Sequence, residues 1–206
     1  MSSALPEIVG PAAPPPLRVA VYGGSFDPPH AAHQQAVRLV ADLSEIDRVL
    51  VVPVFEHAFD KSLASFDHRV RMCELCMALR PSIAVSRLEA TLESPNYTLN
   101  TLRALLALHP EYRLRLVVGA DVLQDAARWH RFDEVIALAP LLPLGRVGVI
   151  CEGAPRPVLP DVSSTEIRGQ LAGRPTARIP RLLRAQLSQV LAPAVLDYIE
   201  AHDLYR

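Results

Sequence analysis

The sequence contains the stretch Val19-Ala-Val-Tyr-Gly-Gly-Ser-Phe-Asp-Pro-Pro-His30-Ala-Ala-His33, an apolar run that leads through two glycines into a helix start. The apolar residues from 17 to 22 predict a buried strand bounded by turn residues. Gly23 and Gly24 lack a Cβ, so another group can approach the backbone closely there. Asp27 and the two prolines after it are typical of a helix start, with Asp27 as the cap residue.

The two histidines of this stretch point to a phosphate site. His30 and His33 are three residues apart and therefore lie on one face of the first helical turn. A helix N-terminus carries free N–H groups and partial positive charge, which suit phosphate. Glycines after a strand or a histidine near a helix end are each common in proteins without such a site. Their occurrence together and in this order favours a site for a polyphosphate.

A second helix start follows late in the chain, at Ser163-Ser-Thr-Glu-Ile-Arg168. Ser163 and Glu166 have the spacing of a capping box, and Val162 with Ile167 can form a hydrophobic staple. These local rules do not explain Arg168, because a cation near the N-terminus of a helix is mildly disfavoured. An anion bound at this helix end would reverse the sign of that effect.

Length and composition exclude several classes of protein. The chain of 206 residues is long enough for one domain with a sizeable core, and half of its residues are hydrophobic. Its net charge of −1 argues against general binding of nucleic acid. No apolar stretch is long enough to cross a bilayer, so we expect no membrane partner. Residues 1–16 predict a flexible tail rather than a signal peptide, and we expect a cytoplasmic protein with its domain at 17–206.

The three cysteines predict neither a disulfide framework nor a metal site. Cys73 and Cys76 have zinc-like spacing, but they fall in a helical pattern, and Cys151 adds no second pair. A structural zinc site needs four ligands. Buried thiols are therefore the interpretation that we favour.

Strand-like and helical patterns alternate along the chain. We expect strands at 17–22, 48–53, 83–89, 114–119 and 135–142, with 147–151 as a possible addition. We expect helices at 31–43, 67–79, 98–108 and 122–127. This alternation predicts an α/β fold with a Rossmann-like parallel sheet and helices on both faces. In such sheets ligands bind at the carboxyl ends of the strands, where Gly23 and Gly24 fall.

The early and late motifs resemble the His-x-x-His and Ser-Ser-Thr-x-Ile-Arg signatures of the nucleotidyltransferase superfamily. Three further segments narrow the resemblance to the nicotinate-nucleotide adenylyltransferase family: Ser94-Pro-Asn-Tyr-Thr-Leu-Asn-Thr-Leu102, Val118-Gly-Ala-Asp121 and Trp129-His-Arg-Phe132. The resemblance implies transfer of AMP from ATP to nicotinate mononucleotide, with Mg²⁺ bound mainly through the ATP phosphates and no metal site built by the protein. The expected partners are thus ATP and a pyridine mononucleotide.

The same resemblance implies roles for individual residues. The catalytic pair is His30 and His33. The ATP-binding set is Gly23, Gly24, Ser25, Phe26, His30, His33, Gly119, Asp121, Ser163, Ser164, Thr165 and Arg168. The mononucleotide-binding set is Lys61, Tyr97, Thr98, Trp129 and Arg146.

Some of these roles have alternatives. Asp121 could be an ordinary helix cap, and Trp129 could be part of the core. The chain departs from the family pattern at His57 to Lys61 and at Gly145-Arg146, where the family often has Pro-Pro-His-Lys and Arg-Pro-Gly. These departures concern the acceptor side, so the resemblance supports the reaction class more strongly than the acceptor.

Three other functions compete with this interpretation. Another transferase of the superfamily, such as phosphopantetheine adenylyltransferase or a cytidylyltransferase, would share both motifs. A non-catalytic NAD-binding module is disfavoured because Gly-x-Gly-x-x-Gly is absent after the first strand. A metal-dependent hydrolase is disfavoured because Asp27, expected as a helix cap, is the lone carboxylate near the two histidines in the sequence, and such a site needs further partners.

Overall fold

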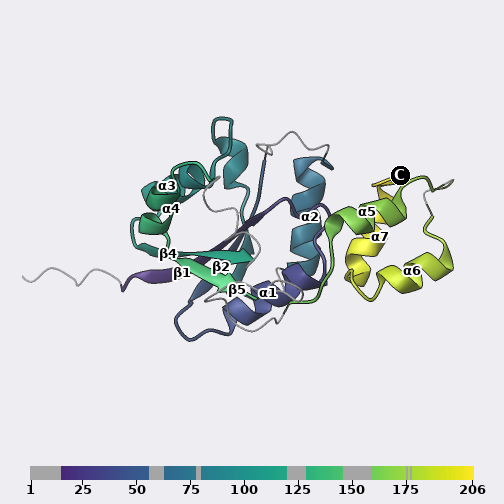
Figure 1. The fold of residues 1–206 in the computed structure, drawn as a ribbon, viewed down its shortest axis with the longest axis horizontal. Helices are drawn as coiled ribbons and strands as arrows, with labels where there is room; N and C mark the ends of the chain where they lie inside the picture. The colour runs from purple at the N-terminus through teal and green to yellow at the C-terminus, as the bar shows by residue number, and fades with distance from the viewer. Residues whose placement is uncertain are drawn as a thin grey trace, which may run out of the picture.

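The computed structural model describes residues 15–55, 63–77, 80–119, 129–145, 159–174, 176 and 178–206. Its centre is a five-stranded parallel sheet in the order β3-β2-β1-β4-β5 (Figure 1). The strands are β1 (Leu17–Gly24), β2 (Arg48–Pro53), β3 (Ile83–Val85), β4 (Tyr112–Gly119) and β5 (Leu141–Leu144). The predicted Rossmann-like α/β fold is confirmed.

Helices cover both faces of the sheet and form a group at one end of the molecule (Figure 1). The helices are α1 (Ala31–Ala41), α2 (Phe66–Met77), α3 (Thr98–Leu108), α4 (Phe132–Leu138), α5 (Ser164–Leu171), α6 (Arg181–Leu187) and α7 (Pro193–Ala201), with a short 3₁₀ helix η1 (Leu88–Thr91). Helices α1 and α2 lie on one face, and α3 and α4 lie on the other. Helix α7 packs against α2 and so joins the C-terminal end to the sheet layer.

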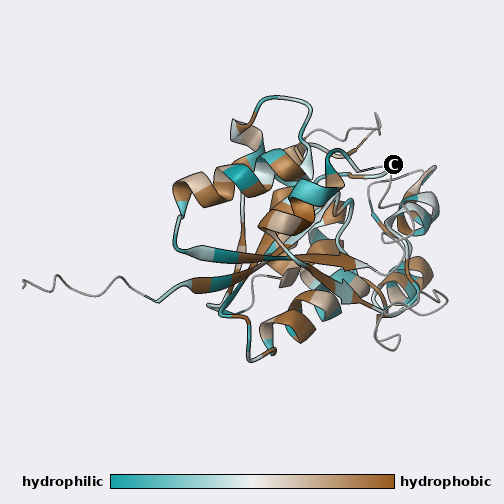
Figure 2. Ribbon diagram, turned by 60° about the vertical axis from the view of Figure 1, so that its left-hand side comes forward, coloured by the Kyte–Doolittle hydropathy of each residue, from teal (hydrophilic) through white to brown (hydrophobic). Residues whose placement is uncertain are grey.

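Successive residues of the central strands supply two separate hydrophobic cores. Ala20 of β1 belongs to the core under α1 and α2, whereas its neighbours Val19 and Val21 belong to the core under α3 and α4. Both cores are apolar, as expected for a parallel strand that is buried on both faces (Figure 2). The sheet therefore holds the carboxyl ends of β1, β2 and β4 side by side at one edge.

The sequence prediction is wrong at two places. The apolar run at 135–142 is not one strand but the end of α4 followed by β5, because Val135 packs under α3 while Leu141 begins the pairing with β4. Short apolar runs fit either structure, and periodicity alone does not separate them. The strand expected at 83–89 ends at Val85, and the remainder forms η1, where Glu89 is buried.

The cap residue of α1 differs from the prediction, although the helix begins at residue 31 as expected. Asp27 is not the cap; the helix begins at Ala31, and His30 takes the cap position in an extended backbone conformation. Asp27 turns its carboxylate into the protein, where it accepts a hydrogen bond from the backbone N–H of Ala64 at 3.1 Å. The predicted helix at 122–127, the possible strand at 147–151 and most of the predicted tail lie outside the described residues. Within the described ranges, no helix is long and apolar enough to cross a membrane.

Candidate active site

A cavity of about 590 Å³ opens at the carboxyl edge of the sheet. Its floor comes from the ends of β1 and β4, including Gly23, Gly24 and Gly119. Its sides come from the start of α1, the start of α5 and the segment before α3. This is the position that the topology of an open parallel sheet predicts for a ligand site.

Phe26 occupies the turn between β1 and α1 and explains why Gly24 is a glycine. The backbone of Phe26 has φ +50°, in the left-handed region, and its side chain is only 2% exposed. A Cβ on Gly24 would lie 3.0 Å from the Phe26 ring, much closer than an ordinary van der Waals contact. The group that approaches the backbone at Gly24 is thus an aromatic ring of the protein itself.

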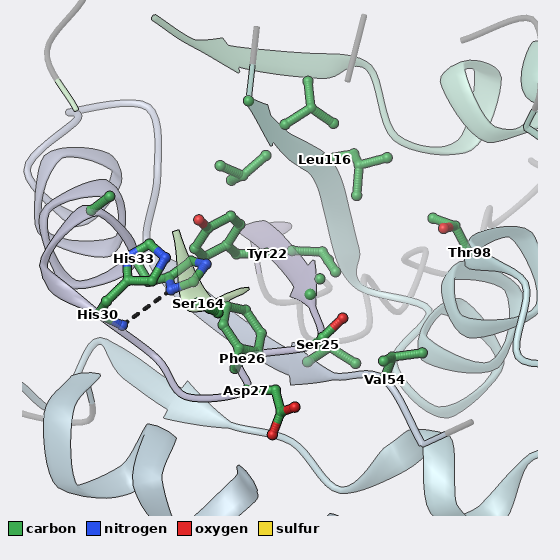
Figure 3. A pocket seen from close by; sticks show the side chains of 18 of the residues that line it. Tyr22, Ser25, Phe26, Asp27, His30, His33, Val54, Thr98, Leu116 and Ser164 are labelled. Carbon is green, nitrogen blue, oxygen red and sulfur yellow. Dashed lines mark hydrogen bonds between the residues drawn. The ribbon is translucent and has the colours of Figure 1, made fainter. Parts of the chain in front are cut away.

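His30 and His33 form a stacked pair at the first turn of α1 (Figure 3). Their ring centroids are 3.8 Å apart, and the rings of Phe26 and His33 form a T-shaped pair with centroids 5.0 Å apart. The His30 backbone N–H donates to Nδ1 of His33 at 3.2 Å. An Nδ1 that accepts a hydrogen bond carries no proton, so a neutral His33 has its proton on Nε2 and offers that N–H as a donor.

The N-terminus of α1 offers fewer amides to a ligand than the sequence suggested. The first helical N–H, that of Ala31, donates to the carbonyl of Val190 at 2.8 Å. The His30 N–H is engaged by His33, as described above. The two imidazoles therefore carry more of any interaction with phosphate than the helix end does.

The start of α5 faces the same cavity and is joined directly to the first motif. Ser164 Oγ donates to the carbonyl of Pro28 at 2.9 Å, and Arg168 Nη1 donates to the carbonyl of Asp27 at 2.7 Å. Ser163 is the cap residue, as predicted, but its Oγ accepts from the N–H of Thr165 rather than from Glu166. The structure thus brings together two motifs that are more than a hundred residues apart.

Arg168 has partners within the protein that the sequence did not reveal. Its Nη1 lies 3.6 Å from Oδ2 of the buried Asp27, and its Nη2 donates to Oγ1 of Thr165 at 3.3 Å. Its side chain is nevertheless 28% exposed, and it forms part of the cavity wall. The guanidinium is therefore held in place with part of its surface open to the cavity.

Arg69 does not line the cavity but holds loops beside it, and sequence reasoning missed this role. It lies within α2, is 1% exposed, and donates to the carbonyls of Ser25 and Ala64 at 2.9 Å and of Phe55 at 3.3 Å. Burial lowers its pKa, and the neighbouring Asp27 opposes this shift. Arg69 thereby fixes the loop that follows β1 to the loop that follows β2. An arginine in a helical pattern gives no sign of this role.

Glu89 is a second missed residue, and it forms part of the cavity wall. Its carboxylate accepts hydrogen bonds from the Thr101 hydroxyl at 2.8 Å and from the Phe55 N–H at 3.0 Å. Burial raises the pKa of Glu89, and these two bonds partly offset the rise. Asn96 donates to the Glu89 carbonyl at 3.0 Å. These contacts hold the segment before α3 against the cavity.

Only some of the residues predicted to bind the mononucleotide lie at the cavity. Thr98 and Trp129 form part of its wall, and Thr98 lies on the side away from the histidines (Figure 3). Tyr97 is not part of the wall; its ring stacks on His130, with centroids 4.4 Å apart. Lys61, Asp121 and Arg146, as well as His57, lie outside the described residues.

The donor groups that the structure describes around the cavity do not include a metal-binding cluster. Among the residues that the structure describes, no group of three or more His, Cys, Asp or Glu side chains could hold a metal ion. Cys73 and Cys76 are free, buried thiols, and burial raises the pKa of Cys76 to about 12. Cys151 lies outside the described part of the chain.

Comparison with known proteins places this chain in a family. A model of the family described as cytidylyltransferase-like matches residues 21–170. A probable nicotinate-nucleotide adenylyltransferase of Anaeromyxobacter dehalogenans is 40% identical over 193 residues, which cover 91% of this chain and 96% of that protein. The chain belongs to the nicotinate-nucleotide adenylyltransferase family. A member from Thermus thermophilus is 35% identical over 92% of this chain and its own full length.

Solved structures share the fold of the present protein. The nicotinic acid mononucleotide adenylyltransferase of Plasmodium falciparum, complexed with NaAD, superposes with a TM-score of 0.75 at 24% identity. The likeness covers 92% of this chain and 97% of that one. The same enzyme complexed with APC gives a TM-score of 0.73. The nucleotidyltransferase fold predicted from the sequence is thus confirmed.

Proposed function

We propose that this protein transfers the AMP part of ATP to nicotinate mononucleotide, forming the nicotinate adenine dinucleotide and pyrophosphate. One observation carries the proposal: His30 and His33 share a single cavity with the start of α5, and the same cavity extends to Thr98 and Trp129. Its volume of about 590 Å³ is in the range of small-molecule and cofactor sites. The names of the relatives at 35–40% identity support the same reaction.

In this proposal the start of α5 binds the β- and γ-phosphates of ATP. Ser164 and Arg168 are held by the backbone of Pro28 and Asp27, so they are in place before ATP arrives. A guanidinium binds phosphate oxygens through charge-assisted hydrogen bonds. Because the partners of Arg168 leave part of it exposed to the cavity, binding ATP requires little rearrangement of this residue.

The chemical step needs no nucleophile from the protein. An oxygen of the acceptor 5′-phosphate attacks the α-phosphorus of ATP, and the bond to the bridging oxygen of pyrophosphate breaks on the opposite side. Negative charge grows on the leaving pyrophosphate and the α-phosphate oxygens during this step. In this proposal the His33 Nε2–H and the His30 imidazole, which stack on each other, stabilise that charge, so positioning and electrostatics supply the catalysis.

We expect Mg²⁺ to arrive with ATP as part of the substrate. The described residues of the cavity offer imidazole, hydroxyl and guanidinium groups, and no cluster of carboxylates. Mg²⁺ prefers oxygen ligands and is commonly held by substrate phosphates, water and one or two carboxylates. Its contribution would be to neutralise part of the triphosphate charge.

The acceptor ring is proposed to bind at the Trp129 end of the cavity. Trp129 meets Phe132 edge to face, with centroids 6.0 Å apart, and it forms part of the wall. An indole face suits stacking on a flat pyridine ring. Thr98, at the first turn of α3, lies in the same wall and can contact the polar substituent of the ring.

A panel of acceptors tests this function. The purified protein is given MgATP with nicotinate mononucleotide, nicotinamide mononucleotide or phosphopantetheine at equal concentration, and pyrophosphate release is measured. We expect nicotinate mononucleotide to be the best acceptor and the amide form to be weaker. Faster release with phosphopantetheine would contradict the proposed acceptor and leave only adenylyl transfer.

A further inference from the structure

The second-to-last residue of the chain reaches back to the loop before the catalytic histidines. The Tyr205 hydroxyl donates to Oδ1 of Asp27 at 2.7 Å, although the two residues are 178 positions apart. Asp27 is 1% exposed, and it lies beside Phe26 and Ser25 at the cavity (Figure 3). A buried carboxylate of this kind requires hydrogen bonds to its oxygens.

The end of the chain is held in the conformation that this contact needs. The N–H of Leu204 donates to the carbonyl of Ile199 at 3.0 Å, and Nη2 of the buried Arg174 donates to the carbonyl of Leu204 at 2.8 Å. Asp203 and Tyr205 both have φ in the left-handed region, at +51° and +60°. Such conformations persist in residues other than glycine when the surrounding structure imposes them.

The Asp27 carboxylate also faces the guanidinium assigned to the triphosphate. Oδ1 accepts from Tyr205 and from the Ala64 N–H, while Oδ2 lies 3.6 Å from Nη1 of Arg168. Burial and the charge of Asp27 raise the pKa of Tyr205, so its hydroxyl remains a donor at neutral pH. With Oδ1 occupied in this way, the atoms of Asp27 that face Arg168 are Oδ2 and the backbone carbonyl oxygen.

We propose that Tyr205 is a positioning residue for ATP: its hydroxyl holds the Asp27 carboxylate so that Arg168 remains turned toward the triphosphate. Without that hydroxyl, the buried carboxylate can rotate and draw the Arg168 guanidinium into a two-point contact. The guanidinium would then be less available to the β- and γ-phosphates. This inference rests on the proposed function, because it assigns Arg168 to that end of ATP.

Tyr205→Phe tests the inference, because it removes one oxygen atom and keeps the ring. The matched control is Tyr198→Phe, which removes a hydroxyl from α7 that lies 3.0 Å from Nδ1 of His68. The dissociation constants of ATP and AMP are measured by titration calorimetry without acceptor, and thermal unfolding is followed on the same samples. Loss of a hydrogen bond to a charged group predicts roughly ten- to hundredfold weaker ATP binding for Tyr205→Phe. AMP binding should change by less than about threefold, since AMP lacks the phosphates that Arg168 would bind.

The control should bind both nucleotides as the unchanged protein does. Equal ATP affinity of Tyr205→Phe and Tyr198→Phe would overturn the inference. It would also be overturned if Tyr205→Phe weakened the binding of ATP and of AMP by the same factor. In an Arg168→Ala background, Tyr205→Phe should cause no further loss of ATP affinity, whereas a full additional loss would also overturn it. Because these titrations need no acceptor, an inactive protein would contradict the proposed function without deciding the role of Tyr205.

Discussion

Replacing Gly24 with alanine should destabilise the protein through one identifiable contact. The new Cβ would lie 3.0, 3.2 and 3.3 Å from three carbons of the Phe26 ring. The ring has little room to retreat, because it is buried and packs edge to face against Tyr22 and His33. Overpacking of this kind costs about 1–3 kcal/mol. If the free energy of unfolding falls by about 2 kcal/mol, the Tm of a chain of this length should fall by roughly 4–8 °C.

Gly23→Ala is the matched control for this prediction. A Cβ on Gly23 would find only the carbonyl oxygen of Val52, at 4.0 Å, which is an ordinary contact. Alanine also restricts the unfolded chain more than glycine does. The Tm of Gly23→Ala should therefore be unchanged or slightly raised. Thermal unfolding of the two variants, followed by circular dichroism, measures the difference. If both variants melt at the same temperature, the tight packing of Phe26 on Gly24 is refuted.

The remaining predictions concern the substrate contacts. Arg168→Ala should weaken ATP binding more than AMP binding, and a uniform loss would show that the guanidinium is not at the triphosphate end. Trp129→Ala should raise the KM for the acceptor and leave the KM for ATP nearly unchanged; equal damage to both, or a large fall in Tm, would indicate a packing role. His30→Ala and His33→Ala should each lower kcat by roughly 10²–10³-fold. Each histidine also belongs to the cap of α1, so a stability loss of about 1 kcal/mol is expected as well. Lower stability with kcat intact would mean that the pair only caps the helix.

The sequence was sufficient for those parts of the fold that local patterns determine. β2 and α3 have the predicted bounds, because a continuous apolar run and a helical periodicity each leave little ambiguity there. The helix start at Ser163 was predicted for the same reason, since a cap residue acts on its own N-terminal turn. The prediction of a strand at 135–142 was wrong because the residues of this run fit either a short buried helix or a strand.

The contacts that organise the site could not be predicted in this way. Asp27 was predicted to cap a helix, but its carboxylate is taken by Tyr205 and Ala64, which are distant in the sequence. Arg69 resembles any other arginine on a helix until the fold places three carbonyls around it. Partners of this kind depend on the tertiary arrangement and leave no local pattern. The sequence therefore pointed to several residues that line the cavity, but not to the contacts that hold them in place.

The destination of the α-phosphate tests the central claim most directly. The protein is incubated with MgATP labelled on its α-phosphate and with nicotinate mononucleotide, and the products are separated and identified by mass. The account predicts that the label passes into a dinucleotide that contains the acceptor, with one pyrophosphate released for each dinucleotide formed. Label recovered only as ADP or AMP, with the acceptor unchanged, would contradict it.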